Sequence, residues 1–139
     1  MTAAARWVVP GAVRRAIVAH AKRERPRECC GFLVGRDRCV THAVAMLNAA
    51  RGRGRYRIDD RDHIALRREL RRFTPPMEIV GVYHSHPRGK AEPSPTDVAE
   101  AHYPEWLYLI VGLEGATTVA GFRIAGGRVA GARLLGARG

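Results

Sequence analysis

The residues best suited to chemistry lie close together in the chain: His84, His86, Ser94 and Asp97. Imidazoles and carboxylates are common zinc ligands, and catalytic zinc sites use three protein ligands and leave the fourth tetrahedral position to a water molecule. Ser94 adds a hydroxyl group to the same stretch. The residue types and their spacing therefore predict a Zn²⁺ site formed by His84, His86 and Asp97, and with it a metal-dependent hydrolase.

The two histidines can bind one ion only if they lie on the same face of an element. Residues two apart share a face of a strand, whereas on a helix they diverge by about 200°. Residues 78–86 are predicted to form a strand, and Pro87 favours an extended backbone at His86. We expect Val80 and Val82 to lie on the histidine face of this strand. The opposite face is expected to carry Ile79, Gly81, Tyr83 and Ser85.

A short helix is predicted to follow the polar loop 87–93. Ser94 suits the N-cap, Pro95 the first helical position and Asp97 the third. The positive end of the helix dipole would help to keep Asp97 ionised, as a metal ligand must be. A histidine on a strand or a Ser-Pro-x-Asp helix start is common without any metal, so the joint spacing is what indicates the site.

The rest of the chain alternates between helices and strands. Helices are predicted at residues 11–24 and from 59 or 60 to about 73, and strands at 28–35, 39–46, 106–113, 117–124 and 128–135. Helices interleave with strands, but several strand pairs form hairpins. We therefore predict a mixed α/β (α+β) sheet in a single domain of residues 1–139.

The composition limits the cellular context. No apolar stretch approaches the roughly 18 residues of a membrane span, and the N-terminus lacks the pattern of a secretory signal. We therefore expect a cytoplasmic protein without a membrane partner. Cys29, Cys30 and Cys39 are interpreted as small buried hydrophobes, because adjacent residues of a strand point to opposite faces and cannot share a metal ion. The sequence leaves the oligomeric state open, a homodimer included.

The formal net charge of +11 comes almost entirely from arginine. Such a charge favours an acidic partner, which can be a protein surface or a nucleic acid. Residues 51–57 form an arginine–glycine patch, but their one aromatic residue, Tyr56, is a poor platform for stacking bases. An acidic protein is therefore the favoured partner.

His84, His86, Pro87, Ser94 and Asp97 resemble the JAMM motif of the MPN+ (Mov34/PAD-1) metallopeptidases, in their small prokaryotic form. The similarity extends over essentially the whole chain and includes Asn48 and residues 28–35, 56–59, 79–83 and 108–111. It implies the JAMM/MPN fold, a curved mixed β-sheet flanked by helices that resembles the cytidine-deaminase architecture. In that fold the zinc site lies at one end of the sheet.

The resemblance also implies a role for each site residue. His84, His86 and Asp97 would bind Zn²⁺, Glu28 would be the general acid and base, and Ser94 would steady the oxyanion. Position in the sequence alone does not favour Glu28 over Glu92, Glu100 or Glu105. All five motif positions match, which argues against a non-catalytic MPN scaffold.

The family hydrolyses peptide and isopeptide bonds at the C-terminus of ubiquitin or ubiquitin-like proteins. Small bacterial members are associated with sulfur-carrier proteins that end in Gly-Gly, including release of cysteine from a carrier adduct. The short loops of this chain favour such a carrier over a polyubiquitin chain. The RadC family has a related metal motif, so a basic, nucleic-acid-associated RadC-like protein is the alternative.

Overall fold

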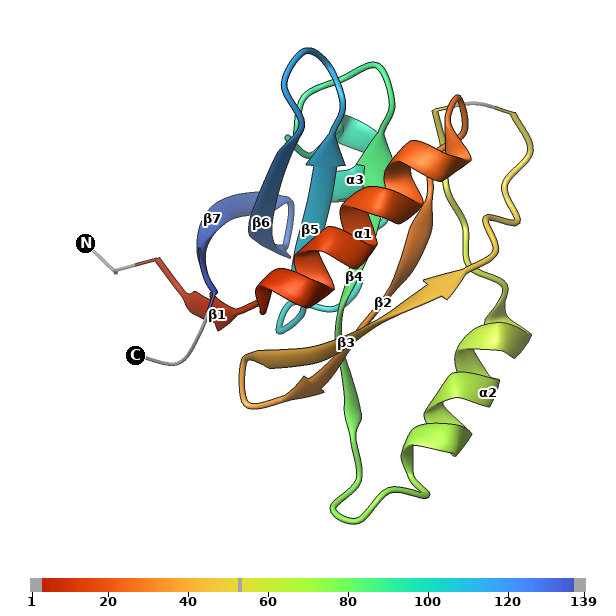
Figure 1. Ribbon diagram of the computed structural model, residues 1–139, viewed down its shortest axis with the longest axis vertical. Helices are drawn as coiled ribbons and strands as arrows, with labels where there is room; N and C mark the ends of the chain where they lie inside the picture. Colours follow the sequence, from red (N-terminus) through yellow and green to blue (C-terminus); the bar gives the residue numbers. More distant parts are fainter. Residues whose placement is uncertain (1–3, 53, 137–139) are drawn as a thin grey trace.

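The computed structural model describes residues 4–52 and 54–136, so Arg53 of the arginine–glycine patch lies outside the described residues (Figure 1). Its helices are α1 (Gly11–Glu24), α2 (Asp60–Leu70) and α3 (Pro95–Ala99). Its strands are β1 (Arg6–Val8), β2 (Cys30–Arg36), β3 (Cys39–Met46), β4 (Glu78–His86), β5 (Leu107–Gly112), β6 (Thr118–Ala125) and β7 (Arg128–Leu135). No described helix is long and apolar enough to span a membrane.

The strands form one mixed sheet in the order β1-β3-β2-β4-β5-β6-β7. β4 lies in the middle of it, antiparallel to β2 and parallel to β5. The predicted mixed α/β fold is confirmed. The sheet closes on itself because β1 pairs with β7 and, at Val8 and Cys39, with β3. β1 was not predicted, because three residues are too few to show a periodicity.

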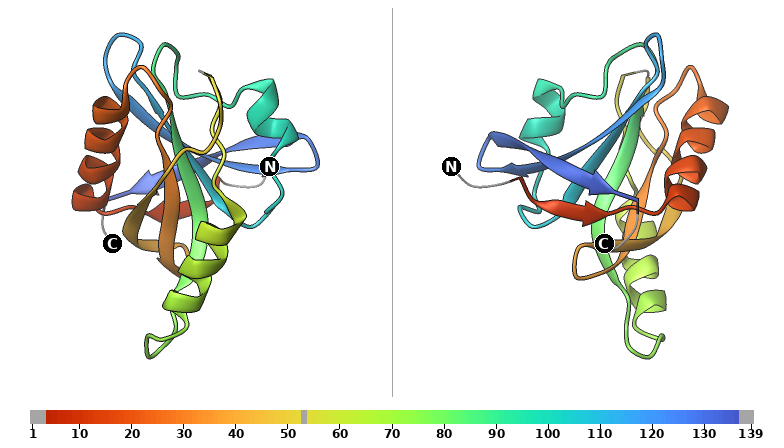
Figure 2. Two further views of the ribbon diagram at one scale, coloured as in Figure 1. Left: turned by 90° about the vertical axis from the view of Figure 1, so that its right-hand side faces the viewer. Right: turned by 60° about the vertical axis from the view of Figure 1, so that its left-hand side comes forward.

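Helices cover both faces of the sheet, with α1 on one side of β2 and β4 and α3 on the other (Figure 2). On the first face, Val13, Ile17 and Ala21 of α1 pack against the strands. On the second face, Leu70 of α2 and Val98 of α3 belong to a separate apolar cluster. β4 is therefore buried on both faces, and the close packing around it restrains the positions of its side chains.

The two faces of β4 differ from the expected alternation at the start of the strand. A register shift between Leu33 and Val34 of β2 leaves one residue of β4 out of step. Ile79 therefore packs in the cluster of Val82, and Val80 packs with Tyr83 against α1. The predictions that Val80 lies on the histidine face and Ile79 on the opposite face were both wrong, because a bulge shifts every side chain before it to the other face.

Two predicted boundaries change by more than one residue. α2 ends at Leu70 rather than near Phe73: Arg71 closes the helix by donating its amide to the carbonyl of Glu69. Phe73 is 48% exposed and so does not belong to the buried face of the helix. The strand predicted at 28–35 begins at Cys30, which leaves Glu28 in the connection from α1. Cys29 and Cys30 are buried and not disulfide-bonded, as expected of small hydrophobes. Cys39 is only half-buried, so the prediction that it is buried was wrong.

Gly81 allows β4 and β5 to approach closely, and this generates a test of the central strand pair. A Cβ atom at Gly81 would overlap the carbonyl oxygen of Leu107 on β5, whereas one at Gly131 on β7 would meet nothing within 4 Å. We expect Gly81→Ala to lower the free energy of unfolding by about 1–3 kcal/mol, the usual cost of overpacking. Gly131→Ala should change it by less than about 1 kcal/mol. Equal stability of the two variants in urea unfolding would contradict the described packing.

Candidate metal centre and catalytic site

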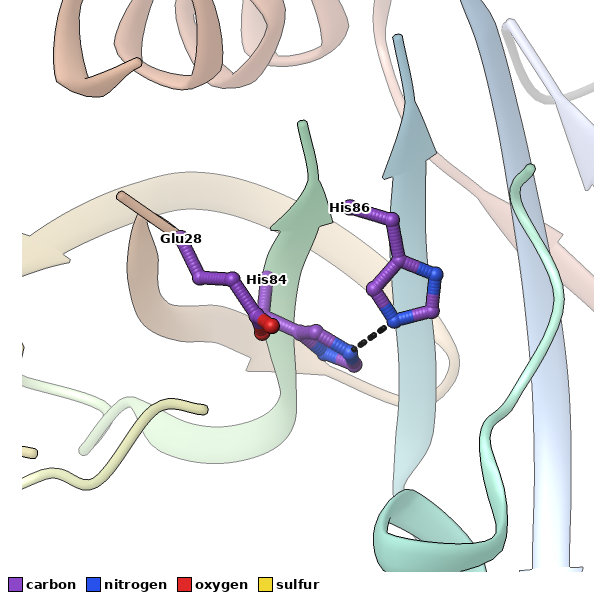
Figure 3. A group of neighbouring side chains, drawn as sticks. All are labelled: Glu28, His84 and His86. Atoms are coloured by element: carbon purple, nitrogen blue, oxygen red, sulfur yellow. Dashed lines mark hydrogen bonds between the residues drawn. The ribbon is translucent and has the colours of Figure 1, made fainter. Parts of the chain in front are cut away.

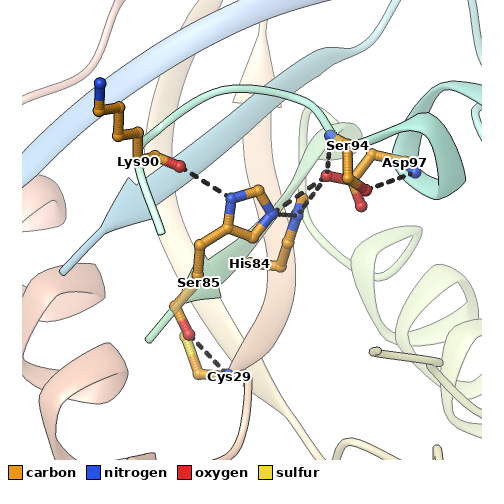
Figure 4. A network of polar contacts seen from close by, with 7 residues as sticks. Cys29, His84, Ser85, Lys90, Ser94 and Asp97 are labelled. Carbon is orange, nitrogen blue, oxygen red and sulfur yellow. Dashed lines mark hydrogen bonds and ion pairs between the residues drawn. The ribbon is translucent and has the colours of Figure 1, made fainter. Parts of the chain in front are cut away.

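Three side-chain atoms converge at the end of β4. The Nε2 atoms of His84 and His86 lie 3.1 Å apart, and each lies 3.1 Å from Oδ2 of Asp97 (Figure 4). Ligand atoms bound 2.0–2.1 Å from a tetrahedral zinc ion lie about 3.3 Å from one another. The donor set and its spacing therefore fit a tetrahedral divalent metal. The structure brings together the three residues that the sequence predicted as ligands.

The two imidazoles are held from different directions. His84 is 2% exposed and its ring stacks on that of Tyr56, with centroids 4.5 Å apart. His86 Nδ1 lies 2.8 Å from the carbonyl oxygen of Lys90 and must carry the hydrogen, because a carbonyl can only accept. In neutral His86, Nε2 therefore presents its lone pair to the site. Such a hydrogen bond to the second ring nitrogen orients histidine ligands in metal sites.

Asp97 is placed by the first turn of α3. The Ser94 hydroxyl accepts a hydrogen bond from the Asp97 amide at 3.1 Å, and the Ser94 amide donates to Asp97 Oδ2 at 2.9 Å. This reciprocal pair is a capping box, as the Ser-Pro-x-Asp sequence predicted. The hydroxyl accepts in this arrangement, so its own hydrogen remains available to another acceptor.

The charges of the three groups depend on one another. Burial opposes ionisation of Asp97, but its hydrogen bonds with the two imidazoles hold its pKa well below the usual range. Burial lowers the pKa of His84 and so favours the neutral imidazole that a metal requires. Burial also disfavours charge on His86, but its bonds to Asp97 and to the Lys90 carbonyl outweigh this and raise its pKa.

Glu28 reaches the same place from the connection before β2. Its carboxylate lies within 4.8 Å of the ligand nitrogens of His84 and His86 (Figure 3). The side chain is 6% exposed, and burial, reinforced by the charge of Asp97, raises the pKa of its carboxyl to about 7. Glu92, Glu100 and Glu105 are all exposed. A carboxyl with a pKa near neutrality can both accept and return a proton at neutral pH.

A cavity of about 410 Å³ opens onto these groups and is lined by Glu28, His86, Ser94 and Arg88 among others. Ser94 therefore borders the same space as the Glu28 carboxylate. A second cavity of about 400 Å³ is lined by Tyr56 among others. Tyr56 was not predicted to have a role at the metal site. No spacing rule connects it to His84, because only the tertiary fold brings their rings together.

Comparisons with known proteins identify the family of the chain. Residues 10–124 match the family described as prokaryotic homologs of the JAB domain. A CysO-cysteine peptidase of Mycobacterium tuberculosis is 38% identical over 99 residues, which are 69% of this chain and 66% of that protein. The match thus spans slightly less than two thirds of that relative's length. A desampylase of Haloferax volcanii is 34% identical over 112 residues, 76% of this chain and 79% of the relative.

Solved structures share the fold. A protein of Desulfitobacterium hafniense, determined in solution, superposes with a TM-score of 0.82 at 27% identity, covering 92% of this chain and 90% of that one. A Salinibacter ruber protein superposes with a TM-score of 0.68 at 26% identity, and the match covers 93% of this chain and 90% of the Salinibacter chain.

The ligand geometry predicts which carboxylate binds a metal. Asp97→Asn removes the charged ligand and should weaken Zn²⁺ binding at least about 100-fold, more than loss of a residue that only orients a ligand. Competition with a chromophoric chelator measures the affinity. Asp62→Asn is the matched control, because Asp62 is an exposed first-turn residue of α2.

Glu28→Gln should change the Zn²⁺ affinity much less than Asp97→Asn, since Glu28 lies farther from the two nitrogens. If Glu28→Gln abolished binding and Asp97→Asn did not, the third ligand would be Glu28 and the assignment would be wrong.

Proposed function

This chain belongs to the family of prokaryotic homologs of the JAB domain, and from that membership we propose that it is a zinc-dependent peptidase. Its substrate is the bond that follows the C-terminal Gly-Gly of a ubiquitin-like or sulfur-carrier protein. The observation that carries the proposal is the convergence of His84, His86 and Asp97 at 3.1 Å, with the Glu28 carboxylate beside them. These residues would combine a metal site of three ligands, His84, His86 and Asp97, with a proton carrier, Glu28.

His84, His86 and Asp97 are the residues that would hold the ion. A zinc ion there would supply a Lewis acid and lower the pKa of a bound water from about 16 toward ~7. The protein's part is to keep Asp97 ionised and His84 neutral, and the pKa shifts of both residues are in that direction. The carbonyl of Lys90 keeps the hydrogen of His86 on Nδ1, away from the site.

Glu28 moves the proton in this proposal. Its carboxylate accepts a proton from the attacking water and delivers it to the amine of the leaving group, which requires a pKa near the working pH. The value of about 7 meets that requirement. Ser94 donates its hydroxyl hydrogen to the oxyanion that forms on the scissile carbonyl. Loss of one such donor typically costs on the order of 100-fold in rate.

Two features support a carrier tail as the substrate. The names of two relatives, CysO-cysteine peptidase and desampylase, describe cleavage at carriers or modifiers of this kind. β3 pairs with β2 along one edge. In the described part of the chain, its other edge pairs with β1 only at Cys39, so residues Thr41 to Met46 have no strand partner on that side. Met46 is the cross-strand partner of Cys30, and Cys30 is in turn the cross-strand partner of His84. The free edge of β3 therefore runs toward the metal site. An extended Gly-Gly tail could add to such an edge through backbone hydrogen bonds.

Cleavage of a carrier fusion tests the function directly. We expect the zinc-loaded protein to release the residue after Gly-Gly from a sulfur-carrier or ubiquitin-like fusion, as followed by mass spectrometry. Glu28→Gln should lower kcat by at least about 100-fold, because general acid–base catalysis contributes that much, while Zn²⁺ stays bound. Glu92→Gln, which changes an exposed glutamate, should leave kcat unchanged. Cleavage that persists after chelation or in Glu28→Gln would contradict the mechanism.

The charge of the chain predicts how a carrier docks. With a formal net charge of +11, the protein should attract an acidic β-grasp domain over long range. We expect kcat/KM for an acidic carrier fusion to fall about tenfold as NaCl rises from about 0.05 M to about 0.5 M, because salt screens such attraction. A short peptide with the same tail should show little change. Equal salt dependence of kcat/KM for both substrates would contradict electrostatic docking of the carrier domain.

A further inference from the structure

Ser85 lies between the two histidines of β4 and has no part in the chemistry described above. It is 0% exposed, and the strand directs its side chain away from the imidazoles of His84 and His86. Burying a hydroxyl costs free energy unless the hydroxyl is hydrogen-bonded. The hydrogen-bond partner of Ser85 therefore indicates its role.

The partner of Ser85 is the residue that follows Glu28. The amide of Cys29 donates to the Ser85 hydroxyl at 2.8 Å, and the amide of Ser85 donates to the Cys29 carbonyl at 3.2 Å (Figure 4). Cys30 is paired with His84 in the ladder of β2 and β4, so Cys29 lies opposite Ser85. The Ser85 side chain thus extends the pairing of β4 with β2 by one residue before the first residue of β2, to Cys29, which follows Glu28.

Glu28 depends on this backbone attachment. Within residues 4–52 and 54–136, its carboxylate accepts no hydrogen bond, although it is buried close to two histidines. Its carbonyl oxygen accepts a bond of 3.0 Å from the side chain of Asn48. The same amide group donates to the carbonyl of Arg55 at 2.9 Å. Glu28 is therefore fixed through its main chain, by Asn48 at its own carbonyl and by Ser85 at the next residue.

We propose that Ser85 is a positioning residue for the hydrolysis, because its hydroxyl and amide fix Cys29 and thereby hold the Glu28 carboxylate against the metal-binding imidazoles. This inference rests on the proposed role of Glu28 as proton carrier. Loss of the hydroxyl leaves the buried amide of Cys29 without its acceptor and releases the main chain beside Glu28. A displacement of about 1 Å at a catalytic group can cost on the order of 100-fold in rate.

Steady-state kinetics on the carrier fusion separate this role from a general loss of structure. Ser85→Ala should lower kcat about 10- to 100-fold with KM and bound Zn²⁺ unchanged, and Ser85→Thr, which retains the hydroxyl, should restore most of kcat. Tyr108→Phe is the matched control: it removes the hydroxyl of another buried strand residue, which likewise accepts a hydrogen bond from a backbone amide, that of Tyr103 at 3.1 Å. It should leave kcat unchanged. Wild-type kcat in Ser85→Ala, or loss of its Zn²⁺, would overturn the proposal.

A double variant tests whether Ser85 acts through Glu28. In the Glu28→Gln background, Ser85→Ala should cause no further loss of kcat, since the group that it positions is already absent. Losses that multiply would show that Ser85 acts on something else and would overturn the proposal.

Amide hydrogen exchange tests the attachment without any activity assay. Ser85→Ala should speed exchange at Cys29 at least about tenfold while the amides of β5 keep their protection. Unchanged exchange at Cys29 would overturn the proposal. If the wild-type protein cleaved no fusion, the proposed function would fail, and this measurement would still decide whether Ser85 holds the main chain beside Glu28.

Discussion

The site depends on one electrostatic constraint: three groups that favour a cation meet within 3.1 Å of one another in a largely buried place. The lone pairs of two imidazole nitrogens and a carboxylate oxygen repel each other unless a proton or a metal ion lies among them. The raised pKa of His86 and the lowered pKa of Asp97 are two expressions of that constraint. Metal binding satisfies it in another way, by displacing the proton.

The fold supplies the rigidity that this arrangement requires. β4 is the strand that both β2 and β5 pair with, and apolar clusters pack on both of its faces. The histidines therefore lie on a strand that is paired along both edges and packed on both faces, whereas Asp97 comes from a short helix fixed by its own capping box. Glu28 lies outside regular structure, and polar side chains from β4 and from the loop at Asn48 hold its main chain. Each element thus contributes a different kind of restraint to the same small volume.

The sequence predicted the parts of the site that are local and not those that depend on tertiary contacts. His84 and His86 share a face because of strand periodicity, and Ser94 and Asp97 form a cap because of their spacing, so both could be inferred from the residues. Glu28 is 56 residues from His84 and was identified only by family resemblance. The bulge at Val80 and the closure of the sheet by β1 follow from pairing between distant strands, which a single sequence does not display. The extent of the domain and a homodimer stay predictions.

We propose that His84, His86 and Asp97 supply all the protein ligands of a divalent metal. X-ray absorption spectroscopy of the zinc-loaded protein measures these ligands directly. We expect only nitrogen and oxygen neighbours at about 2.0–2.1 Å, two of them with the outer-shell scattering of imidazole rings. A zinc–sulfur distance of about 2.3 Å would contradict this assignment, because it would place the ion on Cys29, Cys30 or Cys39 instead.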